Sequence, residues 1–318
     1  IYYSNAILKQ KAIFQNGKRN GKTLNYYERG SLYQILNYKN DRLNGKTVTY
    51  YESGKEMEVS EYINDTLNGN SKRFSEEGKL ILNRNYTKGL RNRFCEDYFE
   101  NGKKDAFYTC VNDKFNGEFI SFYKDTINGK QKKCNYIDGK LEGAFIGYYQ
   151  NGSVMIRSNY SKNKLEGDYF QYYPSDGNIL NNEIIAETGK YLNDKRDGIW
   201  NSYYPDGKKY TSGSYTNDLY NGKWEVLYPN GNIKQAGAYE LGKETGPWSF
   251  YFENGKVRFQ GSYEKGLKNG IWKEYYENEK LKCTYNFVGG KQHGEQTNYN
   301  EMGIATSVKR FANGAEIK

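Results

Sequence analysis

Aromatic residues recur along the chain at a fixed interval, separated by runs of mostly polar residues. Numbering the glycine that opens each interval as position 0, positions 5 and 6 hold an aromatic pair, such as Tyr203-Tyr204, and position 17 is aromatic again, as in Tyr215. Position 2 carries tryptophan in four successive intervals of 24 residues: Trp200, Trp224, Trp248 and Trp272. On a strand, positions 2 and 6 face one side and position 5 the other, whereas on a helix they scatter. The pattern therefore predicts β-strands.

The interval extends over the whole chain as an internal repeat. Tyr2 and Tyr3 fall where Tyr26 and Tyr27 fall, so the chain begins inside an earlier unit. Counting both incomplete ends gives about thirteen units. The units open at Gly21, Gly45, Gly69, Arg93, Gly117, Gly143, Gly167, Gly198, Gly222, Gly246, Gly270 and Gly294.

Each unit is predicted to be one β-hairpin. A strand of about seven residues follows the opening glycine, and a turn such as Pro205-Asp206-Gly207 follows the aromatic pair. Proline fixes φ near −65°, which suits a type I turn and leaves the left-handed conformation to the glycine. A second strand runs to position 17, and a loop such as residues 264–269 leads into the next unit.

The predicted fold is all-β: an open solenoid of tandem hairpins that form one long, twisted antiparallel sheet. A lone hairpin is marginal in water, so the hairpins are expected to lie side by side, with each aromatic stacked on its equivalent in the next unit. About 25 strands at about 4.8 Å spacing would give a ribbon of about 120 Å. We treat residues 1–318 as a single repeat array.

The segment G-P-W-S-F-Y-F-E-N-G-K-V-R-F-Q-G-S-Y-E-K-G-L-K-N-G, residues 246–270, resembles a bacterial variant of the MORN repeat (membrane occupation and recognition nexus). Repeats of this type fill the YwqK family of antitoxin proteins, and the resemblance covers essentially the whole chain. It implies a hairpin solenoid with a non-enzymatic binding role. Family members are linked to toxin neutralisation, and eukaryotic relatives to membrane association and scaffolding. The resemblance assigns no functional residue to this sequence.

Composition refines the picture without changing it. Hydrophobic residues make up 36% of the chain and aromatic residues 17%, so tyrosine carries much of the burial. The net charge of +9 comes from lysines at recurring turn positions rather than from a basic run, which is typical of protected sheet edges. Cys95 and Cys110 lie on strands predicted to pair; free buried thiols are favoured there, with one disulfide as the alternative. Cys134 and Cys283 complete the four cysteines, which show no CxxC pairing.

Departures from the repeat are the candidate partner-binding positions. Arg93 replaces an opening glycine, Thr126 and Glu279 replace turn glycines, and Glu279 suggests a different turn. The unit at 117–142 is two residues longer than the others, and the unit at 167–197 runs 31 residues. Insertions in repeat arrays map to loops that often bind. The insertion, placed around 177–189, supplies the candidates Ile179, Leu180, Glu183, Ile184, Ile185 and Glu187, with a harmless surface loop as the alternative.

No catalytic, metal or cofactor site is predicted. His293 is the only histidine and lies in a loop without a marked nucleophile. Carboxylates fall at turns, and no phosphate-binding or dinucleotide fingerprint is present. No apolar run reaches the length of a membrane-spanning helix, and no signal peptide is visible.

These features predict a non-enzymatic scaffold that binds a protein partner, with an antitoxin or immunity role as its most concrete form. The alternatives are a cell-envelope component, or a module whose Lys and Arg bind an anionic membrane surface. Nucleic acid and small-molecule substrates are not expected. The chain begins at Ile1 inside a repeat, which is compatible with an export signal or lipid anchor upstream; we expect an exported or cell-envelope location in that case, and the cytoplasm otherwise.

Overall fold

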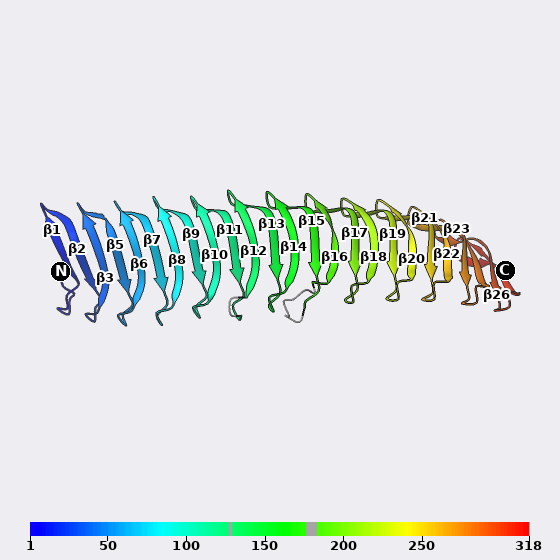
Figure 1. Ribbon diagram of the computed structural model, residues 1–318, viewed down its shortest axis with the longest axis horizontal. Helices are drawn as coiled ribbons and strands as arrows, with labels where there is room; N and C mark the ends of the chain where they lie inside the picture. The colour runs from blue at the N-terminus through cyan, green and yellow to red at the C-terminus, as the bar shows by residue number, and fades with distance from the viewer. Residues whose placement is uncertain (127–128, 176–182, 318) are drawn as a thin grey trace. The chain divides into compact units, whose positions relative to one another are not determined.

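The computed structural model describes residues 1–126, 129–175 and 183–317, and every regular element in these ranges is a β-strand. Its 28 strands form one antiparallel sheet (Figure 1). Within the described residues, β1 pairs with β2 alone and β28 with β27 alone, so the sheet is not closed. The predicted all-β, open hairpin array is confirmed.

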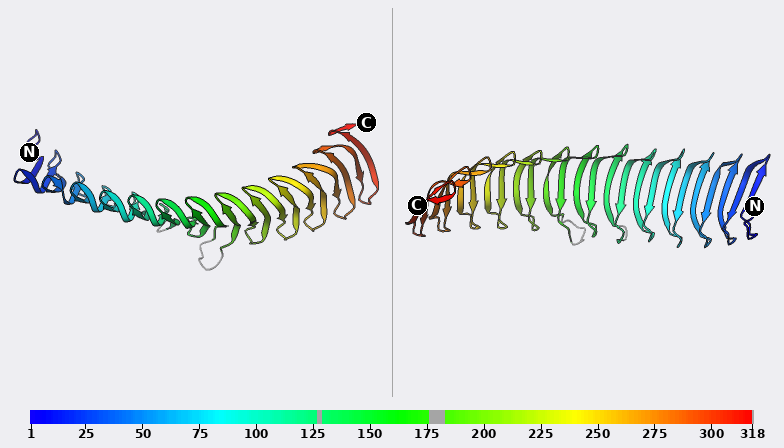
Figure 2. Two further views of the ribbon diagram at one scale, coloured as in Figure 1. Left: turned by 90° about the horizontal axis from the view of Figure 1, so that it is seen from above. Right: turned by 180° about the vertical axis from the view of Figure 1, so that it is seen from behind.

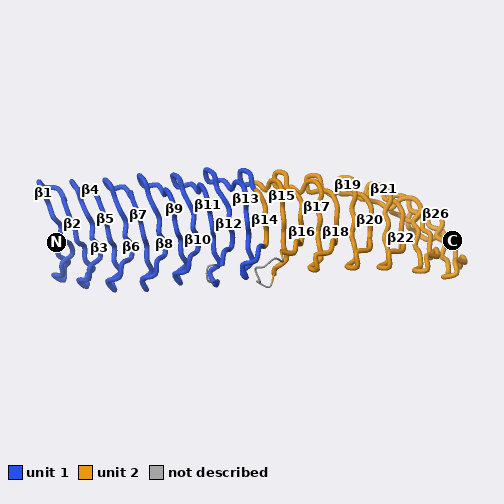
Figure 3. Tube along the Cα trace, viewed as in Figure 1, with its two compact units in different colours: residues 1–154, 160–163 blue, residues 155–159, 164–318 orange. Residues whose placement is uncertain are grey.

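The chain divides into two compact units, and the boundary runs through β14 (Val154–Ser161) (Figure 3). Unit 1 comprises residues 1–154 and 160–163, and unit 2 comprises residues 155–159 and 164–318. Within each unit, consecutive strands lie side by side in both further views (Figure 2). Unit 1 contains β1 (Gln10–Gln15), β2 (Lys18–Tyr26), β3 (Leu32–Lys39), β4 (Arg42–Leu43), β5 (Gly45–Tyr50), β6 (Glu56–Ile63), β7 (Thr66–Phe74), β8 (Leu80–Thr87), β9 (Leu90–Tyr98), β10 (Lys104–Val111), β11 (Lys114–Phe122), β12 (Lys130–Ile137) and β13 (Lys140–Tyr148). Unit 2 contains β15 (Lys164–Tyr172), β16 (Ile185–Leu192), β17 (Lys195–Tyr203), β18 (Lys209–Thr216), β19 (Leu219–Leu227), β20 (Ile233–Glu240), β21 (Lys243–Tyr251), β22 (Val257–Glu264), β23 (Leu267–Tyr275), β24 (Leu281–Val288), β25 (Lys291–Gln292), β26 (Gly294–Tyr299), β27 (Ala305–Ala312) and β28 (Ala315–Ile317).

The longer turns have the geometry that their sequence predicts. In the hairpin β17–β18 the Gly207 amide donates to the Tyr204 carbonyl at 2.8 Å, and the Tyr204 amide donates to the Lys208 carbonyl at 2.7 Å. Gly207 has a φ of 82°, the left-handed bulge that follows a type I turn. Glu279 makes the same pair of bonds with a φ of 66°. The suggestion of a different turn at Glu279 is wrong: the turn is unchanged and a non-glycine residue bears the strain.

Glu279→Gly is therefore expected to stabilise unit 2 by about 1 kcal/mol. The left-handed conformation costs a non-glycine residue about 1–2 kcal/mol, which the substitution removes. Glycine also increases the entropy of the unfolded chain, and this offsets part of the stabilisation. The Glu279–Lys256 ion pair that is lost is 3.5 Å long and exposed, so it contributes little. Hydrogen exchange of amides in β23 and β24 measures the change. Gly255→Glu, at the equivalent position of the preceding hairpin, is the matched reverse variant; equal stability of both variants and the parent would contradict the strain.

The opposite ends of the strands differ from the prediction. Residues 264–269 are not a loop, because β22 ends at Glu264 and β23 begins at Leu267 around a two-residue turn. Lys265 and Gly266 both have positive φ, 52° and 84°, as in a type I′ hairpin. Most strands thus run eight or nine residues, and the opening glycine lies inside a strand at a β-bulge. Arg93 occupies this bulge position with a φ of 69°.

Hydrogen bonds from turn residues join successive hairpins at both edges of the sheet. At the long-turn edge, the tyrosine at position 6 lies beyond the strand end, and its hydroxyl donates to a backbone carbonyl of the next hairpin. At the short-turn edge, a turn Asp or Asn accepts from a backbone amide of the preceding hairpin. The first set includes Tyr27 to Tyr50, Tyr123 to Tyr148, Tyr204 to Leu227, Tyr228 to Tyr251 and Tyr276 to Tyr299; the second includes Arg19 to Asp41, Arg91 to Asp113, Leu165 to Asp194 and Arg196 to Asp218.

One face of the sheet in unit 2 carries an aromatic row. The prediction that each aromatic stacks on its equivalent is wrong, because tryptophans at position 2 alternate with the aromatics at position 17. Tyr239 contacts Trp248 edge to face, with ring centroids 5.1 Å apart and an interplanar angle of 83°. Edge-to-face pairing brings the positive edge of one ring to the negative face of the next. The row runs Tyr191, Trp200, Tyr215, Trp224, Tyr239, Trp248, Tyr263, Trp272 and Phe287.

A glycine on the preceding strand leaves room for each tryptophan. A Cβ added to Gly261 would lie 2.1 Å from the Trp272 ring, closer than real contacts allow. The same holds for the pairs Gly189–Trp200, Gly213–Trp224 and Gly237–Trp248. The indole N–H of Trp272 then donates to the carbonyl of Ser262 at 3.1 Å. Each indole thus lies across the neighbouring strand, which buries Trp200, Trp248 and Trp272 on a single-layered sheet.

Candidate functional site

The candidate partner-binding residues were predicted in the insertion, and in the structure several of them contact neighbouring strands. Ile179 and Leu180 lie outside the described residues. Glu183 is exposed and forms a bidentate ion pair with Arg157 of β14, at 2.5 and 2.7 Å. The same guanidinium donates to the Tyr172 hydroxyl at 3.1 Å. Glu183 therefore anchors the end of the long turn, and its role toward a partner stays a prediction.

The insertion is shorter than predicted. Ile185 pairs with Tyr172 as Lys209 pairs with Tyr203, so Ile185 begins a regular strand and is not inserted. Glu187 lies within β16 and pairs with Arg196 at 3.4 Å. Ile184 accepts the amide of Tyr173, the bond that closes every long turn. The additional residues lie between Tyr173 and Ile185, because strand register, not composition, sets the limits of an insertion.

The repeat aromatics make contacts between neighbouring strands and hairpins. Beyond the tryptophan row, the Tyr204 hydroxyl donates to the Leu227 carbonyl at 2.8 Å, and the Tyr203 carbonyl accepts from Tyr173 at 2.8 Å. These contacts join one hairpin to the next. Trp200, Trp224, Trp248, Trp272 and Tyr204 thus contact their neighbours through their side chains, and Tyr203 does so through its backbone carbonyl.

The four cysteines are free and buried, as the favoured interpretation held, and Cys95 and Cys110 form no disulfide. They lie on the paired strands β9 and β10 and pack with Ala106 and Tyr108. Burial raises the pKa of Cys110 to about 11 and raises that of Cys95 as well. Both side chains are thus neutral thiols near pH 7, which disfavours nucleophilic or redox chemistry.

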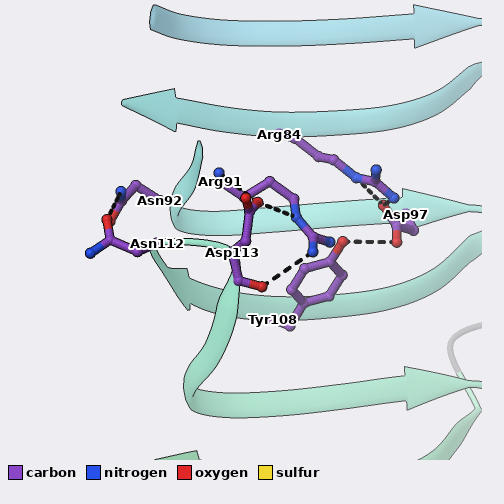
Figure 4. Close-up of polar contacts among 7 residues, drawn as sticks. All are labelled: Arg84, Arg91, Asn92, Asp97, Tyr108, Asn112 and Asp113. Carbon is purple, nitrogen blue, oxygen red and sulfur yellow. Dashed lines mark hydrogen bonds and ion pairs between the residues drawn. The ribbon is translucent and has the colours of Figure 1, made fainter. Parts of the chain in front are cut away.

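A polar network surrounds this cluster in unit 1 (Figure 4). Arg84 and the Tyr108 hydroxyl both donate to the carboxylate of Asp97, each at 3.0 Å. Arg91 donates to Asp113 through its backbone amide at 2.9 Å and its Nε at 3.0 Å. Burial raises the pKa of Tyr108, so its hydroxyl stays protonated and keeps donating. Each charge in this network has a partner, which indicates a structural role.

A cavity of about 370 Å³ opens on the aromatic face of unit 2. It is lined by Arg258, Phe259, Lys268, Glu274, Tyr285 and Phe287. Glu274 accepts from Lys282 and from the Tyr285 hydroxyl, both at 2.8 Å. The Lys268 ammonium lies 4.6 Å from the ring centroids of both Phe259 and Trp272. Nothing in the repeat pattern indicates this cavity, because its lining comes from three strands, β22, β23 and β24.

Apolar side chains at the short turns form a second surface that sequence reasoning missed. One lies in or beside each of five short turns of unit 2, and their exposed fractions run from 47% to 62%. We call this set the aliphatic edge: Leu192, Leu219, Leu241, Leu267 and Val288. A Cβ placed on Gly242 would lie 3.6 Å from Cδ2 of Leu219, so one turn's leucine reaches the next turn. The signal in the sequence was an aliphatic residue beside each Asn-Asp or X-Gly turn.

The lone histidine lies between two short strands in the part of unit 2 that the structure describes. The His293 amide donates to the Asn286 carbonyl at 2.9 Å, beside the bulge between β25 and β26. No group of three His, Cys, Asp or Glu side chains is placed to hold a metal ion within residues 1–126, 129–175 and 183–317. Nor do those residues include a helix long and apolar enough to cross a membrane.

Hairpins joined edge to edge in an open sheet define a repeat protein of the β-hairpin class. Six segments match the family model described as MORN repeat variant: residues 19–40, 141–162, 196–217, 220–240, 244–265 and 268–288. Repeats of this kind are generally associated with binding to proteins or membranes. Four of the matched segments lie wholly in unit 2, where the tryptophans recur.

Other comparisons add no function. No curated protein matches the chain. A TcdB2-TccC3-Cdc42 crystal structure is similar at 10% identity and a TM-score of 0.17, covering 97% of this chain and 19% of that one. A TcdB2-TccC3-TEV crystal structure gives 12% identity, a TM-score of 0.17 and coverages of 92% and 18%. A structure of the Photorhabdus luminescens Tc holotoxin pore is similar at 9% identity and a TM-score of 0.15, covering 93% of this chain and 18% of that one. The chain spans less than a fifth of those proteins, and TM-scores this low carry no argument.

Proposed function

We propose that the protein is a non-enzymatic repeat scaffold that binds another protein along the aliphatic edge of unit 2. The observation that carries this proposal is the run of exposed leucines and valine at successive short turns. Exposed apolar surface that continues from one element to the next is typical of interaction sites, whereas single exposed apolar residues are ordinary. The repeat matches, whose class is associated with protein or membrane binding, support the same role.

Charges along the edge suggest the character of the partner. Lys195, Lys243, Lys265 and Lys291 stand at the same turns, and a cavity of about 320 Å³ beside Leu241 is lined by Glu240 and Glu244 as well as by Lys243 and Lys265. Apolar centres rimmed by charge are typical of protein interfaces. A protein surface that combines apolar side chains with charges of both signs is the complementary partner. A protein toxin neutralised by this chain is the most concrete candidate, and a cell-envelope assembly is the next.

Site-specific photo-crosslinking in the native source tests the edge. A crosslinker at Leu241 is expected to trap a discrete protein, and one at Lys223, on a face of the sheet rather than at a short turn, is expected not to. With that protein purified, Leu241→Glu combined with Leu267→Glu should raise Kd at least about tenfold, which corresponds to about 1.4 kcal/mol. Unchanged affinity would overturn the edge as the binding surface.

The insertion hypothesis is tested with the same partner. Deleting residues 176–182 removes seven residues and restores the spacing of 24 between Gly167 and Gly198, since the present spacing is 31. This deletion leaves β16 intact, unlike one that extends past Ile185. If the aliphatic edge is the surface, the deletion should leave Kd unchanged. Loss of binding on deletion alone would instead assign the surface to the insertion.

The lysines of the same edge favour a second candidate, an anionic membrane surface. Co-sedimentation with vesicles containing anionic lipid, measured at increasing salt, separates the two. Binding through lysines should fall steeply as salt rises to several times the physiological concentration, because the Debye length shortens from about 8 Å at 0.15 M toward 3 Å at 1 M. Binding to a protein through apolar side chains should persist.

A further inference from the structure

Lys268 occupies an unusual environment on the aromatic face of unit 2. Its ammonium lies 4.6 Å from the ring centroids of Phe259 and Trp272 and 5.3 Å from that of Phe287. These rings come from β22, β23 and β24, so three strands surround one cation. The negative faces of aromatic rings attract a cation, but they do not neutralise its charge as a carboxylate does.

Cations at the equivalent position of other hairpins have carboxylate partners. Arg91 pairs with Asp113 at 3.0 Å, and Arg196 pairs with Glu187 at 3.4 Å. Within the described ranges the Lys268 ammonium has no ion pair or hydrogen bond, and burial alone lowers its pKa. A half-buried cation without a counter-ion is costly unless something supplies the opposite charge. Lys268 is therefore a half-buried cation whose charge no carboxylate of the described residues offsets.

The cavity beside Lys268 has room for that anion and for an apolar group attached to it. Its volume is about 370 Å³, within the range of small-ligand sites. The one carboxylate in its lining, Glu274, is already engaged by Lys282 and the Tyr285 hydroxyl, each at 2.8 Å. Arg258 also lines the cavity; it forms no ion pair within the described residues, although its charge helps lower the pKa of Glu274, so the two cations outnumber the one carboxylate. The unengaged charge in the cavity is thus positive.

We propose that this cavity binds a carboxylate attached to an apolar body, with Lys268 as the counter-ion and Phe259, Tyr285 and Phe287 around the apolar part. A cationic ligand is disfavoured, because Lys268 already fills the aromatic cage. The carboxylate belongs either to a free small acid or to the C-terminal residue of a protein, and the two share the same chemistry. The proposal is independent of the scaffold role, since the cavity lies on the aromatic face and not on the aliphatic edge.

Calorimetric titration of the full chain with matched probes tests the site. Phenylacetate supplies an aromatic body with a carboxylate, and phenylacetamide supplies the same body without charge. A short peptide ending in phenylalanine with a free carboxyl group is compared with its amidated form. Phenylacetate or the free-acid peptide is expected to bind, and each neutral counterpart at least about tenfold more weakly, because hydrogen bonds to charged groups contribute about 1.5–3 kcal/mol.

Variants identify the residue. Lys268→Met should weaken binding of the charged probe at least about tenfold, whereas Lys268→Arg should retain most of it. Lys273→Met is the matched control, because Lys273 lies on the same strand but on the opposite face, next to Trp272. Circular dichroism of each variant confirms that the sheet is retained.

Each outcome is decisive. Binding of phenylacetate alone assigns the site to small acids, and binding of the peptide alone assigns it to a protein C-terminus. The proposal is overturned if no charged probe binds at millimolar concentration, if the neutral probes bind equally well, or if Lys268→Met and Lys273→Met behave alike. Because Lys268→Arg keeps the charge, its loss of binding together with intact binding by Lys268→Met would also overturn it.

Discussion

Replacing Trp248 with alanine is expected to lower the stability of the hairpins around it by about 3–5 kcal/mol, the range for buried tryptophan. The side chain is 3% exposed and contacts the rings of Tyr239 and Tyr263 at 5.1 and 5.9 Å. Its indole N–H donates to the Ala238 carbonyl at 3.1 Å. A single-layered sheet has no second layer to fill the space, so both neighbours lose their contacts together.

Hydrogen exchange of amides in β20, β21 and β22 is the appropriate measurement, because repeat arrays open segment by segment. Trp224→Ala is the matched control at the same repeat position. Trp224 is only half-buried and has Tyr220 at 4.6 Å, a ring that remains after the substitution. The Trp224 variant should therefore lose clearly less stability. Equal losses would show that the repeat position, rather than burial, sets the contribution.

The hairpin and its long turn could be predicted because their signals are local. Pro205, Asp206 and Gly207 specify a type I turn with a left-handed glycine by covalent geometry alone, and the structure has that turn. The 24-residue interval then extends the prediction to every unit. Glu279 shows the limit of this reasoning, since the surrounding hairpin holds it in the conformation that glycine would adopt.

The short turns were misread although their residues were typical. Asn217-Asp218 and Lys265-Gly266 are suitable residues for type I′ turns. The glycine that follows each turn, Gly222 or Gly270, is nevertheless the most regular residue of the repeat, and it suggests that a strand begins there. That glycine lies in a β-bulge, where an extra residue with positive φ continues the strand. A loop before each glycine would leave Leu219 and Leu267 without a fixed position, whereas the two-residue turns bring both to the aliphatic edge.

The cavity could not be predicted, because it depends on strand register. Phe259, Trp272 and Phe287 are separated by 13 and 15 residues, and only the pairing of β22 with β23 and of β23 with β24 brings them around Lys268. Each of these strand pairs contains a β-bulge, which changes the face of the sheet to which the following residues point. Counting alternate residues along the sequence therefore assigns residues after the bulge to the wrong face. Carboxylate partners for Arg91 and Arg196 depend on the same register.

The glycine eleven residues before each tryptophan was a signal that could have been recognised. Gly261→Ala is expected to lower the stability of β22 and β23 by about 3 kcal/mol, at the upper end of overpacking effects. The new Cβ would lie 2.1 Å from the Trp272 ring, whose side chain is fully buried and cannot move aside without breaking its bond to Ser262. The backbone of Gly261 does not have positive φ, so the clash alone causes the loss.

A double-mutant cycle with Trp272→Leu isolates this contact. If the indole lies across Gly261, the combined variant should lose less stability than the two single variants lose together, by about 1 kcal/mol or more. The reason is that the smaller leucine accommodates the new methyl group. Ser262→Ala, at the next residue and on the opposite face, should change stability by less than about 0.5 kcal/mol. Hydrogen exchange in β22 and β23 measures the parent and all four variants. Additive losses would mean that tryptophan and glycine contribute independently, and the coincidence of the two residues in four hairpins would then need another cause.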